Sequence, residues 1–260
     1  MDISVLALWR DAGQYINKAL DNLHELSLRH NVEFHFYEND SLDNTALWLQ
    51  QWMDLHEGQV ISERLGRSWG PIDSIERVEW FADYRNRLLQ AVQPLESEYT
   101  LLLDSDISFK PSLIDDYSKF FNEQTVMYTS NTLVAYKCTD WSCRIRRRRR
   151  PCNHLLNPAR RDIFYKYYDA FALIDSEGQP GKFDSCNPFL IEQDRTNWWK
   201  GIPIIVNSAF GGCALIKTEV LNKCRWEATG AGCEHWKFCA QARDHGNIVV
   251  VPTIYAYNVW

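Results

Sequence analysis

The stretch Tyr99-Thr100-Leu101-Leu102-Leu103-Asp104-Ser105-Asp106 decides the fold class, because a strongly apolar run ends abruptly at two carboxylates one residue apart. A short apolar run of this kind is typical of a buried strand. Two carboxylates just beyond such a strand are costly unless a cation neutralises them. Mg²⁺ or Mn²⁺ suits these oxygen ligands, with phosphate oxygens completing the coordination. A solvated turn is the alternative interpretation.

The sequence before this stretch alternates between strand and helix patterns. The expected strands are 3–8, 32–37 and, after the acidic stretch, 126–135; the expected helices are 12–29, 46–53 and 74–95. A polar loop, Glu38 to Thr45, connects the second strand to the second helix. This alternation over residues 1–135 predicts a mostly parallel α/β sheet.

The second half is less regular. Residues 137–200 are rich in Arg, Asn, Pro and Gly. The segment is long for a loop, which predicts a lid or an acceptor-binding insertion. Ordered elements are expected again at 202–206, 213–216, 234–245 and 248–251, with a turn at Gly211-Gly212. In open α/β sheets, ligands bind beyond the carboxyl ends of the strands. The acidic loops Glu38–Ser41 and Asp104–Asp106 both fall at such ends.

Composition and charge limit the classes of protein. The chain has 260 residues, 45% hydrophobic and 24% charged, which excludes disordered, collagenous and coiled-coil proteins. The net charge of −6 gives no global attraction for nucleic acid. Arg144 and Arg146–Arg150 form a local basic run, interpreted as a solvated loop or as a site for an anionic acceptor, a membrane surface or nucleic acid. The run has no interleaved aromatic residues, which weakens the nucleic-acid interpretation.

The ends and the cysteines suggest a location. No transmembrane window and no signal peptide are evident, so a start at Met1 predicts a cytoplasmic protein. The apolar end at Val259-Trp260 suggests one domain of a longer chain. The eight cysteines are expected to be free thiols. Cys138, Cys143, Cys152 and His154 superficially offer four zinc ligands, but they lack paired CxxC spacing, which argues against zinc.

Several landmarks along the chain resemble a known family. Glu38-Asn39-Asp40-Ser41, Arg85-Asn86 and Leu101 to Ile107 resemble the ordered motifs of GT-A fold glycosyltransferases. More narrowly, Tyr168-Asp169-Ala170-Phe171-Ala172, with Gly178 and then Gly211-Gly212, resembles the fungal capsule-associated mannosyltransferases. Yeast mannan polymerase subunits and the glycosyltransferase domains of large algal DNA viruses are also similar. The resemblance spans Ile3 to Trp260.

The resemblance implies a single GT-A domain, Rossmann-like, with a mostly parallel central sheet flanked by helices. Residues 1–135 would bind the nucleotide sugar, and residues 136–260, with the insertion 137–200, would bind the acceptor. Asp104 and Asp106 would hold Mn²⁺ or Mg²⁺, which would act as a Lewis acid on the diphosphate, so Asp106 counts as catalytic. Many relatives add a histidine ligand after the last strand. Asn258 stands at that place here, and His235 or His245 could substitute.

The same resemblance implies roles in donor binding and catalysis. The donor-binding candidates are Trp9, Arg10, Glu38, Asp40, Arg85, Ser105, Gly211 and Gly212. Arg85 would face a phosphate or the sugar; an ion pair with Asp83 or Glu79 is the alternative. Glu234 would be the general base of an inverting enzyme, or would hold a sugar in a retaining one. A glutamate merely favoured at a helix start is the alternative.

The resulting expectation is a metal-dependent transferase that moves a hexose from a nucleotide sugar to a glycan hydroxyl, in glycan biosynthesis such as viral glycosylation. A UDP-sugar such as UDP-galactose is slightly preferred as the donor, and a retaining mechanism is favoured. A GDP-mannose-dependent mannosyltransferase is the alternative. A non-catalytic glycan-binding or scaffold domain, or a nucleic-acid binder that uses the arginine run, would belong to other classes of protein.

Overall fold

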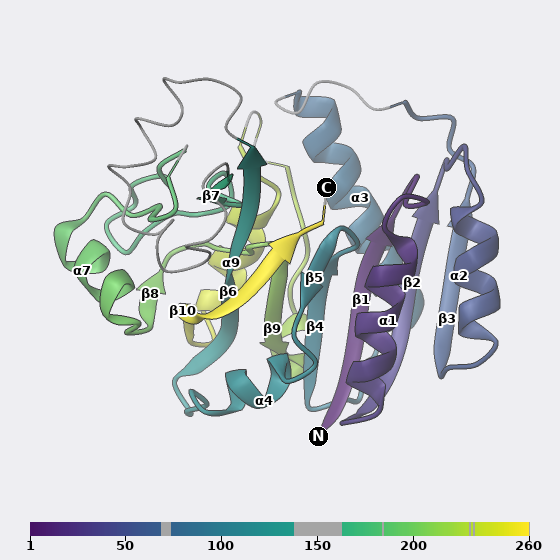
Figure 1. The fold of residues 1–260 in the computed structure, drawn as a ribbon, viewed down its shortest axis with the longest axis horizontal. Coiled ribbons are helices and arrows are strands. Elements are labelled where there is room, and N and C mark those ends of the chain that lie inside the picture. The colour runs from purple at the N-terminus through teal and green to yellow at the C-terminus, as the bar shows by residue number, and fades with distance from the viewer. Residues whose placement is uncertain (69–73, 138–162, 184, 229, 231, 260) are drawn as a thin grey trace.

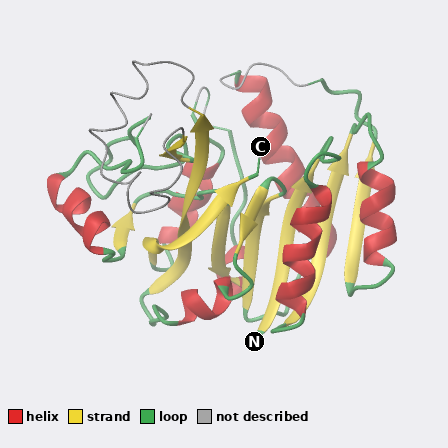
Figure 2. Cartoon of the chain, viewed as in Figure 1, coloured by secondary structure: helices red, strands yellow, loops and turns green. Residues whose placement is uncertain are grey.

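The computed structural model describes residues 1–68, 74–137, 163–183, 185–228, 230 and 232–259. Within this part, ten strands join in one sheet: β1 (Asp2–Trp9), β2 (Asn31–Asn39), β3 (Gly58–Glu63), β4 (Tyr99–Asp104), β5 (Ile107–Phe109), β6 (Thr125–Lys137), β7 (Ile163–Tyr167), β8 (Ile204–Val206), β9 (Cys213–Lys217) and β10 (Asn247–Asn258). The helices described are α1 (Ile16–Ser27), α2 (Thr45–Met53), α3 (Ile75–Val92), α4 (Leu113–Ser118), α7 (Glu192–Lys200), α8 (Thr218–Leu221) and α9 (His235–Arg243). Figures 1 and 2 show the sheet running across the molecule with helices on both faces.

The sheet divides the interior into two apolar layers. Side chains of α1, α2 and α4 pack on one face, and those of α3, α8 and α9 pack on the other. Central strand β1 faces both layers, with Val5, Leu6 and Ala7 each at most 4% exposed. A strand buried on both faces needs a continuous apolar run, and this run is what the sequence contains.

The strand order β3-β2-β1-β4-β9-β6-β10-β5 confirms the α/β class and refines the expected topology. The first four strands of that order are parallel, as predicted. Strand β9 runs antiparallel to both β4 and β6, and β5 runs antiparallel to β10, so the whole sheet is mixed. The sheet was expected to be mostly parallel, but the connections of the less regular second half are not the helical crossovers that parallel strands need.

Several local expectations also change. Strand β3 was not predicted, because its sequence alternates weakly and lies at the edge of the sheet. Residues 107–109 form a strand before the expected helix, and the insertion contributes β7, which pairs with β6, and α7. The division into residues 1–135 and 136–260 remains a prediction. Of the helices that the structure describes, none combines the length and apolar character required to cross a lipid bilayer.

The cysteine expectation is partly wrong. Cys213, Cys224, Cys233 and Cys239 are buried free thiols, as expected. Cys186, however, is disulfide-bonded. The predicted cytoplasmic location stays a prediction. Cys138, Cys143, Cys152, His154 and the arginine run 144–150 lie outside the described residues.

Candidate functional site

The Asp104-Ser105-Asp106 turn is held from three sides. The backbone N–H of Asp104 donates to the carbonyl oxygen of Gly212 at 2.8 Å. The hydroxyls of Ser105 and Tyr15 lie 3.3 Å apart. The carbonyl oxygen of Asp106 accepts from the N–H of Val259 at 2.9 Å. Contacts with Tyr15, Gly212 and Val259 therefore fix the position of the turn that carries both carboxylates.

Register explains why distant residues meet here. Leu103 pairs with Cys213 in the antiparallel β4–β9 ladder, which brings the Gly211-Gly212 turn beside Asp104. Ile107 pairs with Asn258 in the β5–β10 ladder, which brings Asn258 beside Asp106. Its Nδ2 donates to Asp106 Oδ2 at 2.7 Å. The structure thus places Asn258 beside the acidic motif, and its role as a metal ligand stays a prediction.

Both glycines of the turn have a backbone conformation that other residues rarely adopt. Gly211 and Gly212 each have φ of +67°. A Cβ on Gly212 would lie 2.8 Å from Tyr168 Cε1 and 2.9 Å from Ile107 Cγ1. The turn therefore requires glycine both for its φ and for its close packing against the acidic motif.

Tyr168 connects the two aspartates. Its hydroxyl lies 3.4 Å from Asp104 Oδ2 and 3.5 Å from Asp106 Oδ1. Burial, and then the charges of Asp104 and Asp106, raise the pKa of Tyr168 well above its ordinary value, so it remains a hydrogen-bond donor. The two carboxylates converge on one point, as ligands of a shared cation would.

Arg85 of α3 bridges the acidic motif and Glu234. Its Nη2 lies 3.1 Å from Asp104 Oδ1, and its Nε lies 3.5 Å from Glu234 Oε1. The guanidinium is 4.8 Å from the ring centroid of Phe210, and the residue is 7% exposed. Arg85 thus pairs with two carboxylates of the site, and its predicted contact with a phosphate or the sugar stays a prediction.

The ion pair considered as an alternative for Arg85 is made by other arginines. Asp83 pairs with Arg67 at 2.9 Å and with Arg87 at 3.0 Å. Arg85 points to the opposite, buried side of α3. Asp83 and Arg87 are four residues apart and share one face of the helix, whereas Asp83 and Arg85 are two residues apart and do not.

Asp169 is a site residue to which the sequence analysis assigned no role, although its motif carried the family resemblance. It accepts from the backbone N–H groups of Ala172 and Gly211, each at 3.1 Å. Burial, and then the charge of Asp104, raise the pKa of Asp169 to about 7. The available signal was the motif Tyr168–Ala172 itself, in which Asp169 stands between Tyr168 and Phe171.

The site carries more negative than positive charge. Burial raises the pKa of Asp104, and Arg85 offsets that effect only in part. The four carboxyl groups described above share the space with Arg85 and with Arg77, whose charge also interacts with Glu234. A divalent cation would relieve this imbalance, and carboxylate and amide oxygens are ligands that Mn²⁺ and Mg²⁺ accept. The residues present therefore fit such an ion.

The metal set is smaller than the resemblance implied. Among the described residues, no group of three or more His, Cys, Asp or Glu side chains is arranged to hold a metal ion. His235 was a candidate, but its Nδ1 accepts from Trp226 Nε1 at 3.4 Å and its Nε2 lies 3.4 Å from Glu234 Oε1. Burial, and then Arg85, hold its pKa well below 6.5. Both ring nitrogens are engaged away from the aspartates, so the His235 prediction is wrong.

The donor-binding candidates Trp9, Arg10, Glu38 and Asp40 all make contacts within the protein. Trp9 is 1% exposed and packs against Phe36, which makes it a core residue. Glu38, also 1% exposed, accepts from the Ser41 N–H at 3.0 Å and from the Ser62 hydroxyl. Neither side chain is available to a nucleotide, so these two predictions are corrected.

Asp40 and Arg10 secure the loop that follows β3. Asp40 accepts from the N–H groups of residues 65, 66 and 67, and Arg10 Nη2 donates to the carbonyl oxygen of Arg67 at 2.7 Å. Burial raises the pKa of Asp40, but these bonds and one from Asn39 outweigh it and lower the pKa overall. The structure assigns both residues to shaping this edge of the site rather than to a free donor surface.

Three comparisons place this architecture among known proteins. The family model described as cryptococcal mannosyltransferase 1 matches residues 6–245. The structure of Staphylococcus aureus TarS 1–349 has a TM-score of 0.53 at 15% identity, covering 99% of this chain and 60% of that one. The mannosyltransferase PcManGT from Pyrobaculum calidifontis, in complex with GDP-Man and Mn²⁺, has a TM-score of 0.54 at 13% identity, covering 99% of this chain and 56% of that one.

These similarities confirm the GT-A fold that the sequence motifs predicted. The S. aureus protein has also been solved in complex with UDP-GlcNAc, with the same TM-score of 0.53. This chain spans about 60% of the length of the first of these structures. No curated protein matches the chain by sequence.

Proposed function

Because the chain belongs to the cryptococcal mannosyltransferase 1 family, we propose that it transfers mannose from GDP-mannose to a hydroxyl of a glycan, with Mn²⁺ or Mg²⁺ at the Asp104–Asp106 motif. The convergence of both carboxylates on the Tyr168 hydroxyl is the observation that carries the proposal. The family favours mannose over the galactose preferred from the sequence. The complex of PcManGT with GDP-Man and Mn²⁺ supports the same donor and metal for this fold.

Asp104 and Asp106 would hold the metal, and Asn258 would join them through its amide oxygen after a rotation of the amide. When bound, the ion supplies charge neutralisation to the diphosphate as it leaves the sugar. A site with two carboxylates and few other protein ligands leaves coordination positions for phosphate oxygens. With phosphate oxygens as further ligands, the ion would need few ligands from the protein.

Arg85 acts as a positioning residue. Its guanidinium joins Asp104 to Glu234 and stacks on Phe210, so it holds the metal-binding and sugar-facing sides of the site in one geometry. A buried ion pair of this kind contributes more through the geometry that it fixes than through the net stability that it adds. Glu234, at the start of α9, then faces the reacting sugars from a fixed position.

We assign Glu234 to holding a sugar hydroxyl in a retaining transfer, following the family resemblance. A carboxylate beside a buried arginine can accept a hydrogen bond from a hydroxyl without taking its proton. Asp169, with a pKa raised to about 7, is a second carboxyl group at the same site. Its two backbone donors fix it beside the glycine turn.

Donor consumption tests the proposal directly. Proton NMR would follow GDP-mannose, UDP-galactose and UDP-GlcNAc separately, each with Mn²⁺ and an oligomannoside acceptor, and then with EDTA. We expect turnover of GDP-mannose alone, loss of turnover in EDTA, and an α-anomeric product signal. Turnover of a UDP-sugar instead, or turnover that is unchanged by EDTA, would contradict the proposal.

A further inference from the structure

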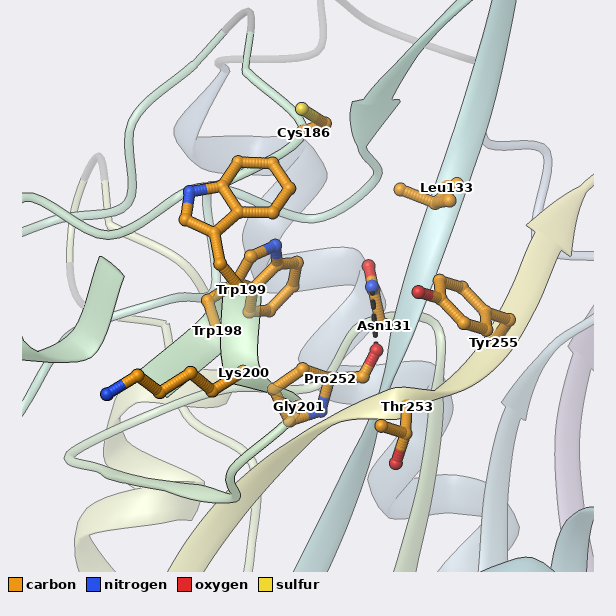
Figure 3. A pocket seen from close by; sticks show the side chains of 10 residues that line it. All are labelled: Asn131, Leu133, Cys186, Trp198, Trp199, Lys200, Gly201, Pro252, Thr253 and Tyr255. Carbon is orange, nitrogen blue, oxygen red and sulfur yellow. Dashed lines mark hydrogen bonds between the residues drawn. The ribbon is translucent and has the colours of Figure 1, made fainter. Parts of the chain in front are cut away.

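A cavity lies apart from the carboxylates, between the end of α7 and the strands β6 and β10 (Figure 3). Its volume is about 220 Å³. Its walls are mainly the rings of Trp198, Trp199 and Tyr255, with Asn131 at its base. None of the residues that line it belongs to the carboxylate site.

The end of α7 is built to present the tryptophans. Gly201 ends the helix with φ of +70°, and a Cβ there would lie 2.7 Å from Thr253 Cγ2 of β10. Glycine thus lets the helix end approach the strand closely. Trp198 is buried against Tyr167 and Phe189, whereas Trp199 remains 43% exposed beside the cavity.

Asn131 supplies a buried polar group that the fold leaves incomplete. It is 4% exposed, and its Nδ2 donates to the carbonyl oxygen of Pro252 at 3.0 Å. Its Oδ1 is buried and has no hydrogen-bond partner among the described residues. Figure 3 shows this amide facing the space between the tryptophan rings and Tyr255, whose hydroxyl points toward it. A buried acceptor without a partner is costly, so a donor brought by a ligand would be favourable there.

We propose that this cavity binds one pyranose residue of the glycan acceptor, beyond the sugar that reacts. A pyranose combines an apolar face, which suits the aromatic walls, with hydroxyl donors, which suit Asn131 Oδ1. The cavity is smaller than the roughly 300–1,000 Å³ of sites that enclose drug-sized ligands, so a nucleotide sugar does not fit. Lys200 points away from the cavity in Figure 3, which favours a neutral ligand.

The position of the cavity suits an extended acceptor. Asn131 and Tyr255 are partners in the β6–β10 ladder, and β10 continues from Tyr255 to Asn258 at the acidic motif. Tyr255 lies three residues before Asn258 on β10, which corresponds to roughly 10 Å along a strand. An oligosaccharide of a few residues can span that separation. The inference that the bound glycan is an acceptor rests on the proposed transferase function, whereas the inference of a sugar site does not.

Calorimetric titration with α-linked mannotriose, in EDTA and without nucleotide, tests the site. We expect wild-type protein to bind the trisaccharide, and Trp199→Ala to weaken binding roughly tenfold through lost ring contact. Tyr255→Phe should weaken it less. Phe183→Ala is the matched control, because Phe183 is an exposed aromatic residue that does not line the cavity, and it should leave binding unchanged. Thermal unfolding would confirm that each variant is folded.

The outcomes separate this inference from the proposed function. Mannotriose binding that depends on Trp199, in a protein that binds no GDP with Mn²⁺, supports the sugar site and contradicts the transferase proposal. Absence of mannotriose binding to the wild type overturns the sugar site, as does equal binding by Trp199→Ala and Phe183→Ala. Both of these results leave the donor site to its own test.

Discussion

Replacing Arg85 with methionine keeps a long apolar side chain but removes the guanidinium between Asp104 and Glu234. Arg85 is 7% exposed and lies 3.1 Å from Asp104 and 3.5 Å from Glu234. The variant would leave the buried carboxylate of Glu234 and the partly buried carboxylate of Asp104, whose side chain is 24% exposed, without this partner. Breaking a buried ion pair by removing one member costs about 3–5 kcal/mol. Arg85→Met should therefore lower the free energy of unfolding by that amount.

The assay is thermal and urea unfolding in EDTA, followed by circular dichroism. For a domain of this size, 1 kcal/mol shifts Tm by roughly 2–4 °C, so Arg85→Met should lower Tm by roughly 6–20 °C. Arg87→Met is the matched control in the same helix. Arg87 pairs with Asp83 at 3.0 Å, but its side chain is 40% exposed. Exposed pairs contribute about 1 kcal/mol or less, so its Tm should change little.

A double-mutant cycle tests the pairing itself. Glu234→Gln should cost less in the Arg85→Met background than in the wild type, because the variant has already lost the cation that Glu234 faces. Equal loss of Tm in Arg85→Met and Arg87→Met, together with additive effects of Arg85→Met and Glu234→Gln, would refute the reasoning that Arg85 bridges the two carboxylates.

Two further predictions concern the site. Gly212→Ala should abolish metal-dependent nucleotide binding while the protein stays folded, because its Cβ would displace Tyr168; Gly178→Ala, at φ of +83° with open space around it, is the control and should retain binding. Asp169 has a pKa raised from 3.8 to about 7, so the folded state holds a proton that the unfolded chain releases, and the free energy of unfolding should fall as pH rises through that window. Asp169→Asn should flatten this part of the Tm–pH profile measured in EDTA; a slope equal to that of the wild type would contradict the assignment.

The sequence predicted the parallel half of the fold well, because strands buried on both faces leave a local signature. Leu101–Leu103 and Val5–Ala7 are continuous apolar runs, and both form central strands. The second half was harder to predict. The local sequence does not indicate that β9 lies antiparallel between β4 and β6, because the direction of a strand depends on long-range pairing.

The site shows the same division. Asp104 and Asp106 were predictable, because carboxylates directly after a buried strand demand compensation. The bridge from Arg85 to Glu234 was not predictable, because the two residues lie on different helices far apart in the sequence. The contacts of His235 with Trp226 and Glu234 are local, but they depend on which face of α9 is buried. Trp9 and Glu38 were assigned to the donor by the family resemblance, whereas the structure uses them as a core residue and a loop anchor.

Calorimetric titration of GDP and UDP, each with Mn²⁺ and again with EDTA, tests the central claim most directly. The account predicts that GDP binds in Mn²⁺, that binding disappears in EDTA, and that Asp106→Ala abolishes it without loss of folding. Binding of GDP that is equally tight in EDTA and in Asp106→Ala, or the absence of nucleotide binding under all conditions, would contradict a metal-dependent donor site at the Asp104–Asp106 motif.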